Sequence, residues 1–237
     1  MSDLSPISVA FLLFPGVTQL DLTAPAQILS RLGNARIDLV WKDREPVDTD
    51  AGFALLPTAT FEEVSQPDIV CVPGGFGTVA VMEDEVTLGW VRDVAQSAQW
   101  VTSICTGSLL LGAAGLLQGY RATSHWASRD QLRWFGATPV NDRIVIDRNR
   151  VTGGGVTSGI DFALKLTALI RGEAHAKFVQ LSVEYDPAPP FDSGSPVKAD
   201  ATTLSAYKAM IERLAPGREE KVRSIAEHLG FRNNEWP

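Results

Sequence analysis

Cysteine and histidine, the residues that build disulfide frameworks and most transition-metal sites, are scarce in this sequence. Its 237 residues include two cysteines and three histidines. Cys71 and Cys105 each lie within or directly after a short apolar run typical of a buried strand, so we expect two reduced thiols and no disulfide. With only three histidines we expect no metal site. This usage of cysteine favours a reducing compartment, the cytoplasm.

Positive charge and long apolar runs are also in short supply. The net charge of −7 argues against nucleic acid or an anionic membrane as a partner, because both attract basic surfaces. No apolar run reaches the ~18 residues of a membrane span, and the first residues carry no basic segment of the kind that opens a signal peptide. We therefore expect a cytoplasmic protein that acts on a small molecule.

Phosphate-binding patterns are missing as well. Three glycine-containing segments could hold a ligand, at residues 74–77, 106–108 and 153–155. None has the spacing of a dinucleotide fingerprint, and none ends in the Lys-Ser/Thr pair of a P-loop. We expect no nucleotide cofactor.

What the sequence does contain is an alternation of short apolar runs with helical periodicity. At 45% hydrophobic content the chain can bury one large core, although length alone permits one or two domains. We expect strands at residues 7–14, 36–42, 68–72 and 100–104, and shorter strands or hairpins at 52–57, 121–124 and 144–152. Helices are expected between them, at residues 18–32, 86–97, 106–114, 127–135, 156–170 and 174–183. This order predicts a mostly parallel α/β sheet with helices on both faces, in a domain of residues 1–195. Residues 196–237 read as a helical extension packed on that domain or on a dimer partner.

Cys105 stands where an apolar strand meets a run of small, helix-forming residues. At such a turn, a helix dipole and free backbone N–H groups favour thiolate over thiol, as at the nucleophile turn of many hydrolases. A cysteine at the end of a core strand is also commonly a small buried hydrophobe. The turn alone does not decide between these roles.

Three further features admit both a structural and a functional interpretation. Asp21, between leucines at the start of a helix, is either an ordinary helix-start residue or a partly buried carboxyl with a raised pKa that transfers protons. Gly75 belongs to a turn that either needs a positive φ or offers an N–H beside Cys105. His125, next to Trp126, is either a core residue or part of the site.

Taken together, six motifs resemble the ThiJ/PfpI superfamily over about residues 7–190: Phe14-Pro-Gly16, Gln19-Leu-Asp-Leu-Thr23, Val72-Pro-Gly-Gly75, Ser103-Ile-Cys-Thr-Gly-Ser108, Ala122-Thr-Ser-His-Trp126 and Thr152-Gly-Gly-Gly155. Within it, the Asp in place of a more usual Glu, the Cys-Thr-Gly-Ser turn and the segment 184–191 look most like the isocyanide hydratases. The resemblance implies a flavodoxin-like sandwich, a homodimer and a nucleophilic cysteine.

The same resemblance implies a lyase that hydrates isocyanides to formamides without any cofactor. Cys105 would attack the isocyanide carbon, and Asp21 would donate and accept protons. Thr106 would hydrogen-bond the acid or the intermediate, and the N–H groups of Gly75 and Thr106 would stabilise developing charge. Asp186 enters only through the resemblance, as a second acid behind the first; otherwise it is a turn residue before Pro187.

Two alternatives stay open on the same site. One is a glyoxalase-like or amide-hydrolysing enzyme, and the other is a non-enzymatic redox sensor built on Cys105. The peptidase-like members carry a His after the cysteine, whereas this chain has Thr106. We also expect covalent modification of the thiol to perturb a helix that begins at Gly154 and includes Val156, if that helix start approaches Cys105.

Overall fold

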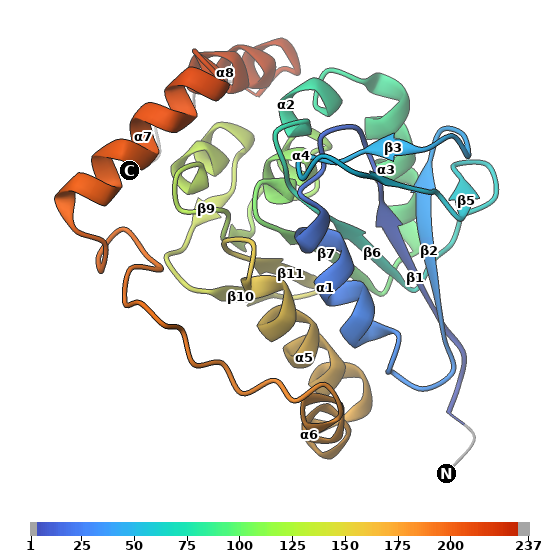
Figure 1. Cartoon of the computed structure of the whole chain (residues 1–237). Helices are drawn as coiled ribbons and strands as arrows, with labels where there is room; N and C mark the ends of the chain where they lie inside the picture. Colours follow the sequence, from blue (N-terminus) through green and yellow to red (C-terminus); the bar gives the residue numbers. More distant parts are fainter. Residues whose placement is uncertain (1–3, 232–237) are drawn as a thin grey trace.

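A seven-stranded sheet forms the centre of the protein, which is described here from a computed structural model for residues 4–231. Its strand order is β10-β11-β7-β6-β1-β2-β5, and all neighbouring pairs are parallel except β10 and β11 (Figure 1). Two small two-stranded sheets, β3-β4 and β8-β9, lie outside it. The strands are β1 Ile7–Leu12, β2 Ala35–Trp41, β3 Val47–Asp48, β4 Ala54–Leu55, β5 Ala59–Thr60, β6 Ile69–Val72, β7 Trp100–Ile104, β8 Arg121–Ala122, β9 Thr138–Pro139, β10 Ile144–Asp147 and β11 Arg150–Gly153.

Helices cover both faces of the central sheet. On one face α1 packs against α5, and α6 packs against α5 in turn; on the other, α3 and α4 contact β6. The helices are α1 Gln19–Leu29, α2 Thr78–Val81, α3 Glu85–Ser97, α4 Gly107–Ala113, the 3-10 helix η1 Arg129–Phe135, α5 Ser158–Arg171, α6 Glu173–Ser182, α7 Ala201–Leu214 and α8 Arg218–His228. The three-layer, mostly parallel α/β sandwich expected from the sequence is thus confirmed.

The inner strands are mostly apolar and almost completely buried because both of their faces are covered. Every residue of β6 is buried, as is every residue of β1 except Ser8. Strands of parallel sheets are typically buried on both faces, because the helices that connect them cover both sides of the sheet. This burial fixes the register of the strands whose carboxyl ends carry the site.

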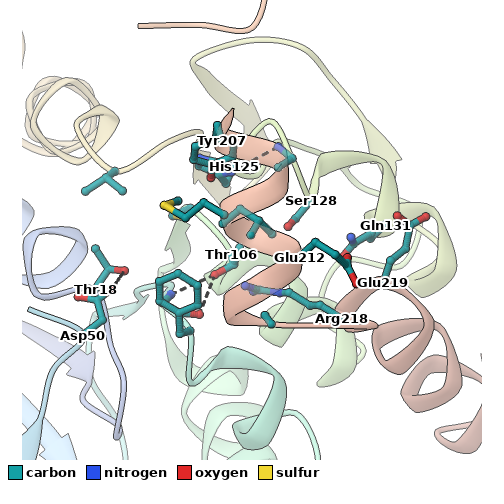
Figure 2. A pocket seen from close by; sticks show the side chains of 18 of the residues that line it. Thr18, Asp50, Thr106, His125, Ser128, Gln131, Tyr207, Glu212, Arg218 and Glu219 are labelled. Carbon is teal, nitrogen blue, oxygen red and sulfur yellow. Dashed lines mark hydrogen bonds between the residues drawn. The ribbon is translucent and has the colours of Figure 1, made fainter. Parts of the chain in front are cut away.

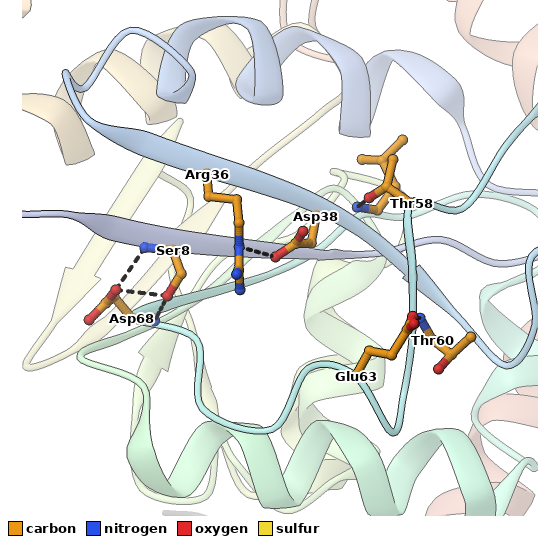
Figure 3. A network of polar contacts seen from close by, with 8 residues as sticks. Ser8, Arg36, Asp38, Thr58, Thr60, Glu63 and Asp68 are labelled. Atoms are coloured by element: carbon orange, nitrogen blue, oxygen red, sulfur yellow. Dashed lines mark hydrogen bonds and ion pairs between the residues drawn. The ribbon is translucent and has the colours of Figure 1, made fainter.

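A polar network links β1 to β6 at the amino ends of these two strands. The backbone N–H and the hydroxyl of Ser8 both donate to Asp68 Oδ2, at 2.7 and 2.8 Å, and the Asp68 N–H donates back to the Ser8 hydroxyl at 3.0 Å. Nearby, Arg36 pairs with Asp38 along β2 (Figure 3). The network satisfies the polar groups that precede β6 and keeps them away from the site.

Several element boundaries differ from the sequence expectation. The helix expected over residues 127–135 is a 3-10 helix that begins at Arg129. The helix expected to begin at Gly154 begins at Ser158, because Gly153 ends β11 and residues 154–157 form the connection. The hairpin of β10 and β11 turns at Arg148, which adopts a positive φ of 54°.

The chain beyond residue 196 forms two helices joined by a short turn. α8 buries Val222, Ile225 and Ala226 and contacts η1 and α2, whereas no residue of α7 is fully buried. The extension therefore rests on the main body of the same chain through α8. Residues 232–237 of the expected extension lie outside the described residues. Over residues 4–231, no helix is both long enough and apolar enough to cross a membrane.

Candidate active site

The carboxyl ends of the central parallel strands converge on Cys105, the residue directly after β7. Its φ is +55°, a left-handed conformation that non-glycine residues rarely adopt. Four hydrogen bonds hold it there. Its N–H donates to the carbonyl oxygens of Gly153 and Gly154, at 3.1 and 2.8 Å, and its own carbonyl accepts from the hydroxyls of Ser108 and Ser124, at 3.1 and 2.9 Å. Backbone strain of about 1–3 kcal/mol persists where the surroundings fix it in this way.

Asp21 lies in the first turn of α1 and is fully buried. Its Oδ2 accepts the N–H of Gly74 at 3.0 Å, while its Oδ1 has no hydrogen-bond partner in the part of the chain that the structure describes. Burial raises the pKa of Asp21 to about 7, against smaller lowering effects from Gly74 and from the Cys105 thiol. The residue does not cap the helix, since Thr18 occupies that position.

Burial opposes the effect of the helix start on the Cys105 thiol. Burial, and then the nearby charge of Asp21, raise the pKa of the thiol well above its usual value; the Thr106 N–H and the positive charge of Arg218 oppose this shift. Burial dominates because the thiol is almost completely enclosed and α4 is only seven residues long. Burial thus favours the protonated form of both groups, the Cys105 thiol and the Asp21 carboxyl.

Gly74 permits the close approach of these two side chains. A Cβ at this position would lie 2.5 Å from the Thr106 backbone nitrogen and 3.0 Å from Asp21 Oδ2. Only glycine leaves room for both. The turn after β6 thus acts as a spacer that brings the acid against the turn after β7.

Thr106 and Gly75 bond to each other rather than to the acid. The Gly75 N–H donates to Thr106 Oγ1 at 3.1 Å. The hydroxyls of Thr78 and Thr106 lie 2.9 Å apart, and the Gly75 carbonyl can accept from either, at 2.8 Å from Thr78 and 3.5 Å from Thr106. The donor roles expected for the Thr106 hydroxyl and the Gly75 N–H are therefore not available in this arrangement, because both protons are already used. The Thr106 N–H, which favours the charged form of Cys105, remains.

A cavity of about 420 Å³ opens in front of Cys105. Eight of its nineteen lining residues belong to α7, α8 and the turn between them (Figure 2). Tyr207, Met210 and Ile211 supply apolar surface from α7, and Val156 and Phe76 supply it from the main body. Polar and charged side chains make up much of the remaining wall, and a pocket of this size with both kinds of surface suits a small molecule.

His125 lines this cavity and is half-buried. Its ring lies 5.6 Å from the ring of Trp126 and 6.1 Å from that of Tyr207. Burial, followed by the charge of Arg218, lowers the pKa of His125 to about 4, so the imidazole is neutral at physiological pH. It contributes an uncharged wall rather than a cation.

The structure does not bring Asp186 to the site. This residue is exposed in the loop after α6 and does not line the cavity, so the second-acid role is not supported within one chain. Gly154 and Val156 do belong to the site, but not as a helix start: Gly154 accepts the Cys105 N–H, and Val156 lines the cavity. In residues 4–231, no group of three His, Cys, Asp or Glu side chains is placed to hold a metal ion.

Sequence reasoning missed Arg218 and Gln131. Both line the cavity, and both have buried polar atoms without a hydrogen-bond partner among residues 4–231: Nε and Nη2 of Arg218, and Oε1 of Gln131. Arg218 opens the segment Arg-Glu-Glu-Lys, which reads as a solvated helix face. Only the three-dimensional path of the extension shows that the side chain of Arg218 faces the cavity.

Comparison with known proteins places this site in a family. The family model described as DJ-1/PfpI family matches residues 7–169. An isonitrile hydratase of Pseudomonas putida is 51% identical over 229 residues, covering 95% of this chain and 99% of that protein. A crystal structure of a ThiJ/PfpI family protein from Pseudomonas syringae superimposes with a TM-score of 0.89 at 43% identity, covering 94% and 91% of the two chains. Drosophila melanogaster DJ-1beta, at 22% identity and a TM-score of 0.70 over 76% of this chain and 98% of its own, shares the fold.

Proposed function

The chain belongs to the DJ-1/PfpI family, and on that basis we propose that it is an enzyme that hydrates isocyanides (isonitriles) to N-substituted formamides. The observation that carries the proposal is the position of Cys105, in the wall of the cavity, next to the buried carboxyl of Asp21, with only Gly74 separating the acid from the turn that follows Cys105. The name of the Pseudomonas putida relative, which this chain matches over nearly its whole length, supports the choice of substrate.

In the first step, the Cys105 sulfur attacks the terminal carbon of the isocyanide. Asp21 accepts the thiol proton as the carbon–sulfur bond forms, then delivers it to the same carbon, which has gained carbanion character. The product is a thioimidate, R–N=CH–S–Cys105. A carboxyl whose pKa is about 7 suits this exchange, because it both takes up and releases a proton near neutral pH.

In the second step, water adds to the thioimidate carbon. One water proton passes through Asp21 and the nitrogen gains one, giving R–NH–CH(OH)–S–Cys105. Cleavage of the carbon–sulfur bond releases the formamide R–NH–CHO and restores the thiol. The sum is one isocyanide and one water for one formamide, and no step uses a metal or an organic cofactor. The Thr106 N–H is the nearby donor for charge on sulfur.

The test is conversion of cyclohexyl isocyanide to N-cyclohexylformamide, followed by chromatography. We expect Cys105→Ala to abolish turnover, and Cys71→Ala to retain it, because Cys71 is a buried thiol in β6 that does not line the cavity. Undiminished turnover in Cys105→Ala contradicts the mechanism. Methylglyoxal consumption faster than isocyanide turnover would favour the glyoxalase-like alternative. A redox sensor would instead show peroxide-dependent binding of a partner, and robust catalysis without such binding would set that alternative aside.

We propose further that the enzyme is a cytoplasmic homodimer and that residues 196–237 extend the α/β domain of residues 1–195. Support for a dimer comes from exposed apolar side chains on α6: Phe178 is 66% exposed and Leu181 80%. Light scattering after gel filtration measures the assembly directly, and a mass of 25.6 kDa would contradict the dimer.

A further inference from the structure

The guanidinium of Arg218 lines the cavity but has no role in the proposed mechanism. Arg218 is the first residue of α8, and its side chain extends into the cavity toward Thr106 (Figure 2). Its Nε and Nη2 are buried and have no hydrogen-bond partner among residues 4–231. Arginine remains charged in proteins, so these are cationic donors held away from water and left open.

No carboxylate of the described chain neutralises this charge. Four acidic residues also line the cavity, but all of them are exposed to solvent: Asp50, Glu212, Glu219 and Glu220. None of them forms an ion pair with Arg218 within residues 4–231. Buried charges are ordinarily paired, because an unpaired one destabilises the fold. An unpaired guanidinium that faces a cavity is therefore suited to an anion that arrives with the ligand.

The cavity that Cys105 and Arg218 both line also has apolar surface. Tyr207, Met210 and Ile211 supply it from α7, so a ligand in the cavity can contact the thiol, these side chains and the guanidinium. Low local polarity strengthens a charge-assisted hydrogen bond, and a carboxylate matches the fork of a guanidinium with two parallel bonds.

We propose that the preferred substrates are isocyanides that also carry a carboxylate, with the isocyano carbon at Cys105 and the carboxylate on Nε and Nη2 of Arg218. The inference rests on the proposed hydration and deepens it by naming the substrate class. Arg218 then determines specificity: it binds a part of the substrate that does not react, so its contribution shows in KM more than in kcat.

A competing role for Arg218 acts through the nucleophile. Its positive charge favours the thiolate of Cys105, so its loss would slow the attack on every isocyanide. The two roles differ in one respect. An electrostatic effect on Cys105 lowers kcat equally for charged and neutral substrates, whereas carboxylate binding affects only the charged substrate.

The experiment compares 4-isocyanobenzoate with its methyl ester, which removes the charge and keeps the ring. The variants are wild type, Arg218→Gln and, as a matched control on the same helix, Arg223→Gln, whose exposed side chain pairs with Glu227. We expect Arg218→Gln to lower kcat/KM for the acid about 10- to 100-fold through KM, with less than about a threefold change for the ester, the size expected for a hydrogen bond to a charged group. Arg223→Gln should match wild type on both.

An equal loss on both substrates in Arg218→Gln, or a wild-type preference for the ester, overturns the proposal. If wild type hydrates neither compound, the proposed function fails, and calorimetric titration with 4-formamidobenzoate and its methyl ester still decides on the anion site. A Kd for the acid about 10-fold or more weaker in Arg218→Gln, with no change for the ester, supports the site. Equal Kd values in the two proteins overturn it.

Discussion

Replacing Asp21 with Asn should stabilise the protein by an amount that grows with pH. Burial raises the pKa of Asp21 to about 7 in the folded protein, whereas an Asp in an unfolded chain titrates near ~4. Because the folded state binds this proton more tightly, the carboxyl imposes no penalty below about pH 4. As the pH rises from about 4 to about 7, its ionisation increasingly favours the unfolded chain, and above about 7 the penalty is constant.

The size of the effect follows from the difference of about three pKa units. At about 1.4 kcal/mol per unit, the carboxyl lowers the free energy of unfolding by about 4 kcal/mol at pH 8.5 and by about 1.5 kcal/mol at pH 5. An asparagine does not ionise, and its amide oxygen can still accept the Gly74 N–H. The stability advantage of Asp21→Asn over wild type should therefore increase by roughly 2.5 kcal/mol between these two pH values.

Urea unfolding of both proteins, at about pH 5 and about pH 8.5, measures this increase. Asp142→Asn serves as the control, since Asp142 is exposed and should show no such change with pH. The difference between the two pH values is the quantity to follow, because it cancels any constant effect of the new amide group. A stability difference that is the same at both pH values would refute the reasoning, since burial would then not perturb this carboxyl.

Three further predictions concern the same site. The kcat/KM for isocyanide hydration should rise about tenfold per pH unit below about pH 7 and level off above it, because Asp21 must be ionised to accept the Cys105 proton; a flat profile in wild type would count against that role. Gly74→Ala should lower kcat about 100-fold by pushing the acid and the nucleophile apart, whereas Gly89→Ala, where an added Cβ meets nothing within 4 Å, should leave it unchanged. Alkylation of Cys105 should raise crystallographic B-factors over residues 153–166, and equal B-factors in modified and unmodified crystals would disprove the coupling.

Local patterns were sufficient to predict the sheet and the strand-to-helix turn at Cys105. Residues 100–104 are all apolar or β-branched except Ser103, and the small residues that follow Cys105 favour a tightly packed helix, so the junction was predictable from the sequence. Asp21 stood out for a similar reason: an acid between two leucines in an apolar helix start needs a buried partner. The Gly74 N–H supplies that partner in the structure.

Properties that depend on three-dimensional surroundings were not predictable in the same way. The balance of effects on the Cys105 pKa was not predictable, because a helix start is visible in the sequence, whereas the degree of burial around the sulfur is not. The hydroxyl of Thr106 contacts that of Thr78, which lies at the start of α2, nearly thirty residues earlier in the chain. Arg218 lies more than a hundred residues from Cys105, and no local pattern indicates that α8 returns to the nucleophile.

The cavity wall has two parts, one built by the carboxyl ends of the central strands and the other by the helical extension, and substitutions in the two parts have different consequences. Substitutions near Cys105 and Asp21 disturb both the chemistry and the packing of the central sheet. By contrast, α7 buries no residue fully and yet supplies Tyr207, Met210 and Ile211 to the cavity. Its inward positions can change with little effect on folding, so related proteins can acquire new substrates by varying this helix while the reaction itself is retained.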